Sequence, residues 1–344
     1  MQALILAGGK GTRLRPLTVY TPKPVVPILN SPFLLYQIEV LRKADITDIT
    51  LSLSYQPDKI QHVLGNGSDH GVTLRYITEP TPMGTGGAYR FAAGATRATT
   101  VVFNGDILTD IDVAAMVAFH RSKSATATIA LVEVDDATRY GLVETATDGR
   151  IAAFREKPDA EMLAASSTKT INAGIYVLEP EVLDLIAEEE NRSFEYNVFP
   201  ELITRKLPFF GYKIEKYWLD IGTPANYLRA HHDLLNGRIA PLKNEDENGS
   251  DLATHAEVDS TSVIGAGCTI KPGARIINSV LGTGTHVEEK AVVENSVIWA
   301  HTRVASSAEI RDSIIGRSCH IGRNARVDGA VLGDKTTLTD YTIV

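Results

Sequence analysis

The first residues with an evident chemical use form a glycine-rich segment near the N-terminus. An apolar run of strand length, Gln2–Ala7, ends in Gly8-Gly9-Lys10-Gly11-Thr12-Arg13. Glycines let backbone N–H groups approach an anion closely, and the lysine and arginine neutralise its charge. A further lysine, Lys23, lies between two prolines that stiffen the backbone around it. The pattern predicts a phosphate-binding loop.

Two familiar phosphate loops are excluded by single residues. A Walker loop needs serine or threonine directly after its lysine, whereas Lys10 is followed by Gly11. A dinucleotide-binding fingerprint needs a third glycine or alanine where this chain has Leu14. The loop therefore belongs to a different class of phosphate-binding site.

Two aspartates are candidates for a metal site. Asp106 follows a predicted strand, Thr100–Phe103, and open α/β sheets bind ligands at the carboxyl ends of their strands. Asp220 lies in the run Tyr217-Trp218-Leu219-Asp220-Ile221-Gly222-Thr223-Pro224. Carboxylate oxygens suit Mg²⁺, which takes few protein ligands and completes its shell with phosphate oxygens and water. From the residues alone, Asp106 is equally a turn residue and Asp220 equally a helix cap.

These motifs together resemble the sugar-1-phosphate nucleotidyltransferases, also called nucleotide-sugar pyrophosphorylases. The resemblance rests on Gly8–Thr18 with Pro22-Lys23-Pro24, on Asn104-Gly105-Asp106, on Glu156-Lys157-Pro158 and on the run around Asp220. The resemblance covers the first two-thirds of the chain. Within this family, the motifs look most like those of the GDP-mannose pyrophosphorylases (mannose-1-phosphate guanylyltransferases) and their bacterial relatives. The resemblance implies that a sugar-1-phosphate attacks the α-phosphorus of a nucleoside triphosphate and that pyrophosphate leaves.

The resemblance also implies a role for particular residues of this chain. The implied catalytic residues are Arg13, Lys23, Asp106, Lys157 and Asp220, and Mg²⁺ would be held by Asp106 and Asp220. The implied nucleotide-binding residues are Leu6, Ala7, Gly8, Gly9, Gly11, Thr12, Glu79, Thr85 and Gly86. The implied sugar-phosphate residues are Gly141, Glu156, Lys157 and Asn172. By itself, a neighbouring Glu156 and Lys157 would be read as a surface charge pair.

The residues leave more than one base and more than one sugar open. A carboxylate accepts hydrogen bonds only, so Glu79 matches the N1–H and N2–H₂ donors of guanine and favours GTP. Backbone groups could still read a pyrimidine. Heptose-1-phosphate with GTP, glucose-1-phosphate with UTP or dTTP, and an aminosugar-1-phosphate with UTP therefore remain alternatives. A regulatory subunit that binds nucleotide sugar without turnover and an acyltransferase are alternatives from other classes.

Strand and helix patterns alternate along the first half of the chain and predict an α/β, Rossmann-like, mostly parallel sheet. Ser31-Pro32 is expected to open a helix that reaches about Ala44, with serine as cap. From Thr126 strands become more frequent. The predicted catalytic domain covers residues 1–237, and a polar segment at 238–253 is interpreted as a linker.

Residues 254–344 carry a strict repeat of seventeen residues in which single aliphatic residues follow steps of six, six and five. The aliphatic residues are Ile264, Ile270, Ile276, Leu281, Val287, Val293, Ile298, Val304, Ile310, Ile315, Ile321, Val327, Leu332, Leu338 and Val344. This spacing predicts a β-helix with three short sides, and it resembles the left-handed parallel β-helix of hexapeptide repeats. Cys268 and Cys319 would lie three coils, roughly 14 Å, apart and are expected to be free thiols.

Composition excludes other classes of function. The formal net charge of −8 disfavours nucleic acid as a partner, and no apolar run reaches the about 18–20 residues of a membrane helix. A cytoplasmic protein is therefore expected. The β-helix is interpreted as the part through which the chain forms a homodimer or higher oligomer. Trp299 is expected on an outer corner of it, where an aromatic side chain suits an interface; the matching positions of the other coils are Gly265, Gly282, Gly316 and Gly333.

Overall fold

The computed structural model describes the whole chain except residues 95–96, 160, 162–167, 188–190 and 243–249. The described residues form two compact units. Unit 1 comprises Met1–Gly9 and Tyr36–Trp218, and unit 2 comprises Lys10–Leu35 and Leu219–Val344. The predicted phosphate loop is therefore divided between them, since the chain leaves unit 1 directly after Gly9. In the described part of the chain, no helix has the length and apolarity needed to cross a membrane.

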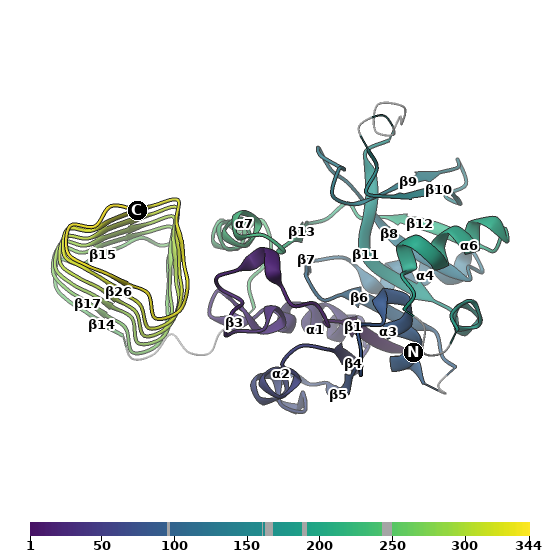
Figure 1. Ribbon diagram of the computed structural model, residues 1–344, viewed down its shortest axis with the longest axis horizontal. Helices are drawn as coiled ribbons and strands as arrows, with labels where there is room; N and C mark the ends of the chain where they lie inside the picture. Colours follow the sequence, from purple (N-terminus) through teal and green to yellow (C-terminus); the bar gives the residue numbers. More distant parts are fainter. Residues whose placement is uncertain (95–96, 160, 162–167, 188–190, 243–249) are drawn as a thin grey trace. The chain divides into compact units, whose positions relative to one another are not determined.

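A nine-stranded sheet organises unit 1, with the order β10-β9-β11-β6-β1-β4-β5 and with β8 joining β11 to β12 (Figure 1). The parallel sheet expected from strand–helix alternation is confirmed in β6-β1-β4-β5, and the strands after Thr126 add mainly antiparallel pairs. The strands are β1 (Gln2–Leu6), β4 (Asp48–Leu53), β5 (Thr73–Thr78), β6 (Thr100–Asn104), β8 (Ala127–Glu133), β9 (Gly141–Thr145), β10 (Ile151–Glu156), β11 (Thr170–Leu178) and β12 (Phe209–Lys213).

Helices connect the strands of this sheet. They are α1 (Leu34–Lys43), α2 (Pro57–Leu64), α3 (Gly84–Ala93), α4 (Val113–Ser122) and α6 (Phe199–Thr204), with 3₁₀ turns η3 (Ser68–His70) and η4 (Pro180–Leu185) and a π-helical turn η5 (Phe194–Val198). Phe194, Phe199 and Phe209 stack in series at centroid distances of 5.4 and 5.3 Å and hold these turns on the sheet.

The expected helix start at Ser31-Pro32 is wrong. Ser31–Pro32 forms strand β3, which pairs with β2 (Pro27–Ile28) in a hairpin, and α1 begins only at Leu34. The two residues between the strands, Leu29 and Asn30, have φ values of 45° and 65°. Two successive positive φ angles are the signature of a type I′ turn, whose twist suits a tight hairpin. The turn therefore overrides the capping signal.

Unit 2 contains the turns η1 (Thr12–Leu14) and η2 (Lys23–Val25), the hairpin, helix α7 (Pro224–Leu235) and the repeats. Two short strands lie at the predicted metal-binding residues. Strand β7 (Ile107–Thr109) directly follows Asp106, and strand β13 (Trp218–Asp220) ends at Asp220. Thr223 caps α7 by accepting a hydrogen bond from the Asn226 backbone N–H at 3.3 Å, and Pro224 occupies the first helical position.

The repeats form a β-helix of stacked coils with three parallel sheets (Figure 1). The first sheet contains Asp251–Leu252 (β14), Thr269–Ile270 (β17), His286–Val287 (β20), Arg303–Val304 (β23), His320–Ile321 (β26) and Thr337–Leu338 (β29). The second contains Glu257–Val258 (β15), Arg275–Ile277 (β18), Val292–Glu294 (β21), Glu309–Arg311 (β24) and Arg326–Asp328 (β27). The third contains Val263–Ile264 (β16), Val280–Leu281 (β19), Val297–Ile298 (β22), Ile314–Ile315 (β25) and Val331–Leu332 (β28).

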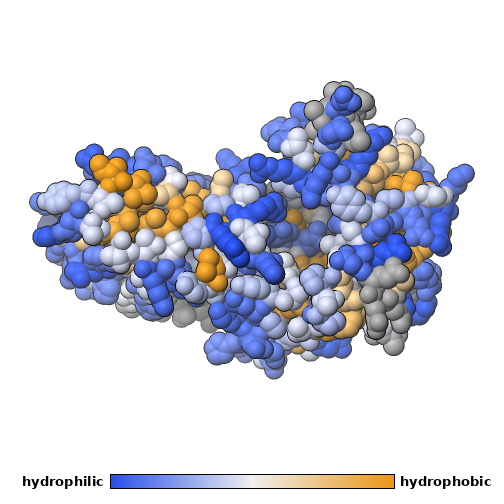
Figure 2. All heavy atoms as spheres, in the orientation of Figure 1, coloured by the Kyte–Doolittle hydropathy of each residue, from blue (hydrophilic) through white to orange (hydrophobic). Residues whose placement is uncertain are grey.

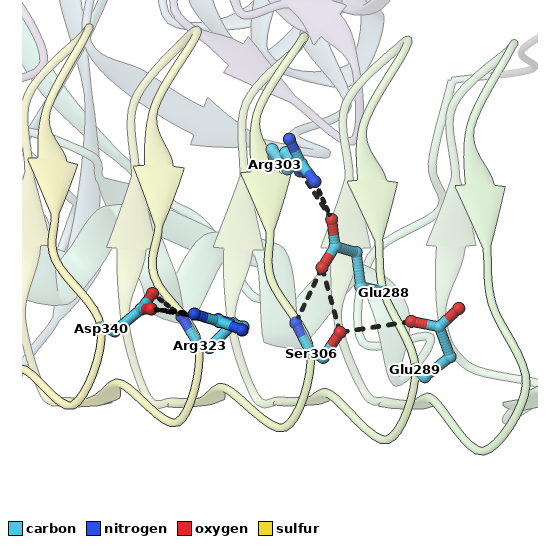
Figure 3. A network of polar contacts seen from close by, with 6 residues as sticks. All are labelled: Glu288, Glu289, Arg303, Ser306, Arg323 and Asp340. Carbon is cyan, nitrogen blue, oxygen red and sulfur yellow. Dashed lines mark hydrogen bonds and ion pairs between the residues drawn. The ribbon is translucent and has the colours of Figure 1, made fainter.

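The register confirms the seventeen-residue repeat. Ile270 pairs with Val287, which pairs with Val304, and all three side chains are fully buried inside the coils. Ion pairs outside the core add contacts between coils: Arg303 pairs with Glu288, which also accepts from Ser306, and Arg323 pairs with Asp340 (Figure 3). Exposed pairs of this kind contribute little stability each, about 0–1 kcal/mol. The inward aliphatic column is therefore the main source of cohesion.

Cys268 and Cys319 are free and buried, as the repeat predicts. Burial raises the pKa of both thiols. Neither sulfur is therefore activated for redox chemistry at neutral pH.

Trp299 does not stand on an exposed outer corner. Its side chain is 2% exposed, and its indole N–H donates to the hydroxyl of Tyr227 in α7 at 3.0 Å. The Arg317 guanidinium lies 5.4 Å from the ring centroid. The tryptophan is therefore part of the packing between the β-helix and α7 within unit 2, which sequence periodicity cannot show.

The α7 helix also buries a histidine whose titration should affect stability. Burial, with a smaller contribution from the neighbouring His232, lowers the pKa of His231 to about 3. An unfolded chain protonates histidine near pH 6.5, so below that pH the unfolded state binds more protons than the folded state. The free energy of unfolding should therefore fall as the pH is lowered from about 6.5 towards 3, at up to about 1.4 kcal/mol per pH unit.

Denaturant titrations at several pH values measure this slope. His231→Leu should flatten it between pH 6 and 4, whereas His62→Gln, which changes an exposed histidine on α2, should leave it unchanged. Equal slopes for wild type and His231→Leu would show that His231 does not carry this dependence.

Candidate active site

Gly8 and Glu79 lie against one another in unit 1. A Cβ atom on Gly8 would approach Glu79 Oε1 and Ser54 Oγ to 2.9 Å each, so a larger residue would displace these two side chains. Glu79 Oε1 accepts from the Ser52 hydroxyl at 3.0 Å, and its other oxygen accepts from the Met83 N–H at 3.5 Å. The Ser54 hydroxyl donates to the Gly8 carbonyl. The predicted base-recognition residue is thus fixed beside the end of β1.

Thr85 and Gly86 have structural contacts of their own. The Thr85 hydroxyl donates to Glu195 at 2.8 Å and accepts from the Phe194 N–H at 2.9 Å. A Cβ on Gly84 would approach the Arg192 carbonyl oxygen to 2.5 Å, and one on Gly86 would approach it to 3.2 Å. These glycines let the start of α3 lie against another backbone segment. A nucleotide-binding role for Thr85 and Gly86 stays a prediction.

The turn that carries Asp106 is held at both ends. The Gly105 N–H donates to the Leu6 carbonyl at 2.9 Å, and a Cβ on Gly105 would approach that oxygen to 2.8 Å. The fully buried Gln37 donates from one amide nitrogen to the carbonyls of Asn104, at 2.9 Å, and Ile107, at 2.8 Å. Gln37 therefore joins the residues on either side of the turn and orients Asp106. Nothing in the local sequence indicated this role.

Replacing this glutamine should affect turnover as well as stability. Gln37→Met keeps the length of the side chain but leaves two buried carbonyls without their donor, at a cost of about 1–3 kcal/mol. Because the turn would loosen around Asp106, we expect turnover to fall about tenfold in steady-state assays at temperatures where the variant is folded. Gln61→Met, at an exposed position of α2, is the matched control. Wild-type turnover in folded Gln37→Met would contradict the orienting role.

The predicted sugar-phosphate residues come together on adjacent strands. Gly141 at the start of β9 pairs with Glu156 at the end of β10, and β11 pairs with β9 through Ile171 and Leu142. A Cβ on Gly141 would approach Glu156 Oε2 to 2.8 Å. Lys157 follows with a φ of 49°, and its N–H donates to the Tyr140 carbonyl at 3.2 Å.

Asn172 lies next to this group because it follows Ile171, which pairs with Leu142 of β9. Asn172 donates to the Tyr176 hydroxyl at 3.0 Å and accepts from the Gly174 N–H at 3.0 Å. Gly174 has a φ of 74°, and a Cβ there would approach Asn104 Nδ2 to 2.8 Å. The amide of Asn172 is therefore fixed by the strand that carries it.

Glu156 has an unusual electrostatic environment. Burial raises the pKa of its carboxyl, nearby Glu195 raises that pKa further, and Lys157 opposes both effects. Burial and the same Glu195 also raise the pKa of Tyr176. Sequence reasoning missed Glu195, which no motif connects to Glu156. The carboxylates of Glu156 and Glu195 can accept hydrogen bonds from hydroxyl groups such as a sugar presents, whereas the fully buried Tyr176 hydroxyl is already bonded to Asn172.

In unit 2, Lys23 lies against the turn formed by Gly11. A Cβ on Gly11 would approach Lys23 Cβ to 3.0 Å, and Gly11 has a φ of 61°. The Thr18 hydroxyl donates to the Gly11 carbonyl at 2.7 Å. Lys23 is 8% exposed and begins η2. The second half of the predicted phosphate loop is thus a closed turn around this lysine.

Asp220 faces Arg13 in the same unit. Arg13 Nη2 lies 3.8 Å from Asp220 Oδ2, and Asp220 Oδ1 accepts from the Gly222 N–H at 2.6 Å. A Cβ on Gly222 would approach Arg13 Nη2 and Asp220 Oδ1 to 2.7 Å each. The glycine of the Asp-Ile-Gly run therefore leaves room for the arginine beside the carboxylate.

The expected Mg²⁺ needs oxygen ligands from the chain. Within the described ranges, no group of three or more His, Cys, Asp or Glu side chains is placed to hold a metal ion. A site with one or two carboxylates and the remaining positions filled by phosphate oxygens and water is the ordinary choice of Mg²⁺. Asp106 in unit 1 and Asp220 in unit 2 each offer carboxylate oxygens of the kind that Mg²⁺ takes, and their shared role as metal ligands stays a prediction.

The fold and these groups of residues define a nucleotidyl transferase. The model of the nucleotidyl transferase family matches residues 2–237, and this chain belongs to that family, as the motifs implied. A second model, the left-handed β-helix domain of the EIF2B epsilon subunit, matches residues 245–344. The C-terminal repeats are therefore a left-handed parallel β-helix.

Named relatives are similar over most of their length. A mannose-1-phosphate guanylyltransferase of Mycobacterium tuberculosis is 38% identical over 80% of this chain and 78% of its own. A mannose-1-phosphate guanyltransferase of Saccharomyces cerevisiae is 34% identical over 76% of this chain and 72% of its own. Among solved structures, HddC from Yersinia pseudotuberculosis aligns with a TM-score of 0.58 and 31% identity, over 68% of this chain and 99% of its own.

Proposed function

We propose that this enzyme transfers a guanylyl group from GTP to mannose-1-phosphate, giving GDP-mannose and pyrophosphate. The similarity to relatives named mannose-1-phosphate guanylyltransferase carries the proposal. The carboxylate of Glu79, fixed beside Gly8, supports guanine because it offers only hydrogen-bond acceptors.

The residues of this chain would act by positioning and charge neutralisation. A phosphate oxygen of the sugar-1-phosphate forms a bond to the α-phosphorus of GTP, the bond to the bridging oxygen breaks, and pyrophosphate leaves. Arg13 and Lys23 would hold the triphosphate and stabilise the charge that develops on pyrophosphate. Lys157 would hold the attacking phosphate, and Glu156 and Asn172 would orient the sugar. Asp106 and Asp220 would hold Mg²⁺, which when bound neutralises charge on the phosphate oxygens.

A substrate matrix tests the assignment. Purified full-length enzyme is assayed for pyrophosphate release with GTP, UTP, dTTP and ATP against mannose-, glucose-, heptose- and N-acetylglucosamine-1-phosphate. GTP with mannose-1-phosphate should have the highest kcat/KM. If another pair is best, the substrate assignment is lost and the family remains. Absence of turnover with every pair would instead favour a regulatory subunit.

We also propose that the enzyme assembles through the β-helix into a homodimer or higher oligomer. Hydrophobic side chains gather near the C-terminal end of the β-helix (Figure 2), where Ile343 and Val344 are 77% and 47% exposed. Contiguous apolar surface of this kind is typical of association sites. The buried Trp299 contributes nothing to this surface.

Light scattering at micromolar concentration should show more than one copy of the chain. Ile343→Asp should shift the population towards the monomer, because a buried unpaired charge is costly, whereas Thr342→Asp in the same coil is the control. A monomeric wild-type chain would refute the assembly.

We further propose a cytoplasmic enzyme with the domain boundaries 1–237, 238–253 and 254–344, although strand β14 (Asp251–Leu252) at the end of this linker already pairs with β17 of the β-helix. The free, buried Cys268 and Cys319 are compatible with a reducing compartment. Of the proposed linker, residues 243–249 lie outside the described part of the structure.

A further inference from the structure

Trp299 interrupts an otherwise regular feature of the β-helix. The matching position of the other coils is glycine at 265, 282, 316 and 333, and a Cβ on Gly282 would approach the backbone nitrogen of the next coil to 2.4 Å. Glycine is therefore the residue that the coil geometry itself favours. A bulky indole at this corner needs another explanation, and its partner lies outside the β-helix.

The indole begins a chain of hydrogen bonds that ends in the phosphate-loop segment. Trp299 Nε1 donates to the Tyr227 hydroxyl at 3.0 Å, and this hydroxyl donates to the carbonyl of Pro27. Both aromatic side chains are buried, Tyr227 completely. Because one hydroxyl both accepts and donates, its orientation is determined by the indole on one side and the carbonyl on the other.

Pro27 is connected closely to Lys23. The turn η2 starts at Lys23, the Val25 N–H donates to the Pro22 carbonyl at 3.0 Å, and the Val26 N–H donates to the Lys23 carbonyl at 3.2 Å. Pro27 follows directly and begins the hairpin. A restraint on the Pro27 carbonyl is therefore a restraint on the backbone that carries the Lys23 ammonium.

Other contacts show that the same segment is seated on the coils at several points. Asn30 in the hairpin turn donates to the Leu281 carbonyl at 2.9 Å. Pro16 lies against Gly333, where an added Cβ would be 3.1 Å from Pro16 Cβ. Helix α7, which carries Tyr227, also contacts the coils, since His232 Nε2 lies 3.0 Å from the Asn295 carbonyl. Trp299 is distinct among these contacts because it reaches the segment through the side chain of Tyr227.

We propose that Trp299 and Tyr227 are positioning residues for nucleotide binding. The β-helix, through the indole and the phenol, holds the Lys23 turn in the conformation that receives the triphosphate. The inference rests on the proposed nucleotide-binding role of Lys23. It assigns to the β-helix a contribution to substrate affinity that is separate from assembly.

The test removes each hydrogen bond while keeping the ring. Trp299→Phe deletes the indole N–H but keeps an aromatic face for Arg317, and Tyr227→Phe deletes the hydroxyl. Each should raise the KM for GTP about fivefold to tenfold, the loss expected for a buried hydrogen bond. The KM for mannose-1-phosphate should change less than twofold. The double variant should resemble the single variants, because either change already breaks the chain of bonds.

A second measurement needs no substrate. Hydrogen exchange of the full-length protein reports the Val25 and Val26 N–H groups, and both variants should accelerate it about tenfold. Ser313→Ala is the matched control: it removes a fully buried hydroxyl that bonds to the Arg311 carbonyl and the Ala330 N–H within the β-helix. This control should leave both the exchange at Val25 and Val26 and the KM for GTP unchanged.

The outcomes separate this proposal from the proposed function. If Lys23→Met weakens GTP binding but Trp299→Phe and Tyr227→Phe do not, Lys23 keeps its role and the positioning proposal fails. If Lys23→Met leaves GTP binding intact, both fail. Unchanged exchange at Val25 and Val26 in the two aromatic variants overturns the positioning proposal whatever the substrate is. A purely stabilising role predicts equal changes for both substrates, which would also overturn it.

Discussion

Asp220→Asn is expected to lower turnover by orders of magnitude while the fold stays intact, and Asp106→Asn should do the same. Each substitution keeps the shape of the side chain and removes the charge that Mg²⁺ needs. In Asp220→Asn the amide oxygen can still accept from the Gly222 N–H, so the Asp-Ile-Gly turn should persist. Steady-state assays over a range of Mg²⁺ concentrations measure the loss, and calorimetric titration of Mn²⁺ with nucleotide measures metal binding directly.

Asp233→Asn is the matched control for this prediction. Asp233 is also a buried carboxylate of unit 2, and it pairs with Arg238 at 2.9 Å and with Arg229 at 3.4 Å. In sequence it lies near the C-terminal end of α7, whereas the Asp-Ile-Gly run precedes that helix. Its replacement should lower stability and leave the Mg²⁺ dependence unchanged. Near-wild-type turnover of Asp106→Asn or Asp220→Asn at limiting Mg²⁺ would remove that residue from the metal site.

Lys23→Met and Lys157→Met should both impair the enzyme, but with different substrates. Loss of Lys23 should weaken GTP binding and the stabilisation of pyrophosphate, whereas loss of Lys157 should raise the KM for the sugar-1-phosphate. By analogy with oxyanion donors, each loss should cost about 2–4 kcal/mol, equivalent to about 30-fold to 900-fold in kcat/KM.

Initial-rate kinetics with each substrate varied in turn separate the two defects. Lys123→Met is the control, because this half-buried lysine donates to the Asp148 carbonyl and lies over the Phe210 ring, away from both predicted subsites in sequence. Identical kinetic defects for the two substrates in Lys23→Met and Lys157→Met would contradict the division of roles.

The repeats and the motifs could be predicted from the sequence because each reports a local physical requirement. The seventeen-residue period follows from one inward aliphatic per side of each coil, and the structure buries Ile270, Val287 and Val304 accordingly. Alternating strand and helix patterns report parallel strands such as β1 and β4. Gly105 is required because a Cβ would collide with the backbone of Leu6 and Ala7, and Gly8 and Gly222 leave room for the polar side chains beside them.

Other features depend on residues that are distant in the chain and have no repeating pattern. Gln37 orients the Asp106 turn across about seventy positions, and Trp299 bonds to Tyr227 across seventy-two. Ser31 and Pro32 carry a helix-start signal, yet the tight turn at Leu29 and Asn30 pairs them as a strand. Sequence determined this protein's periodic core and its chemical motifs, since these repeat or cluster along the chain. Only the tertiary structure decided contacts such as those of Gln37 and Trp299, because their partners come from segments that are distant in the chain.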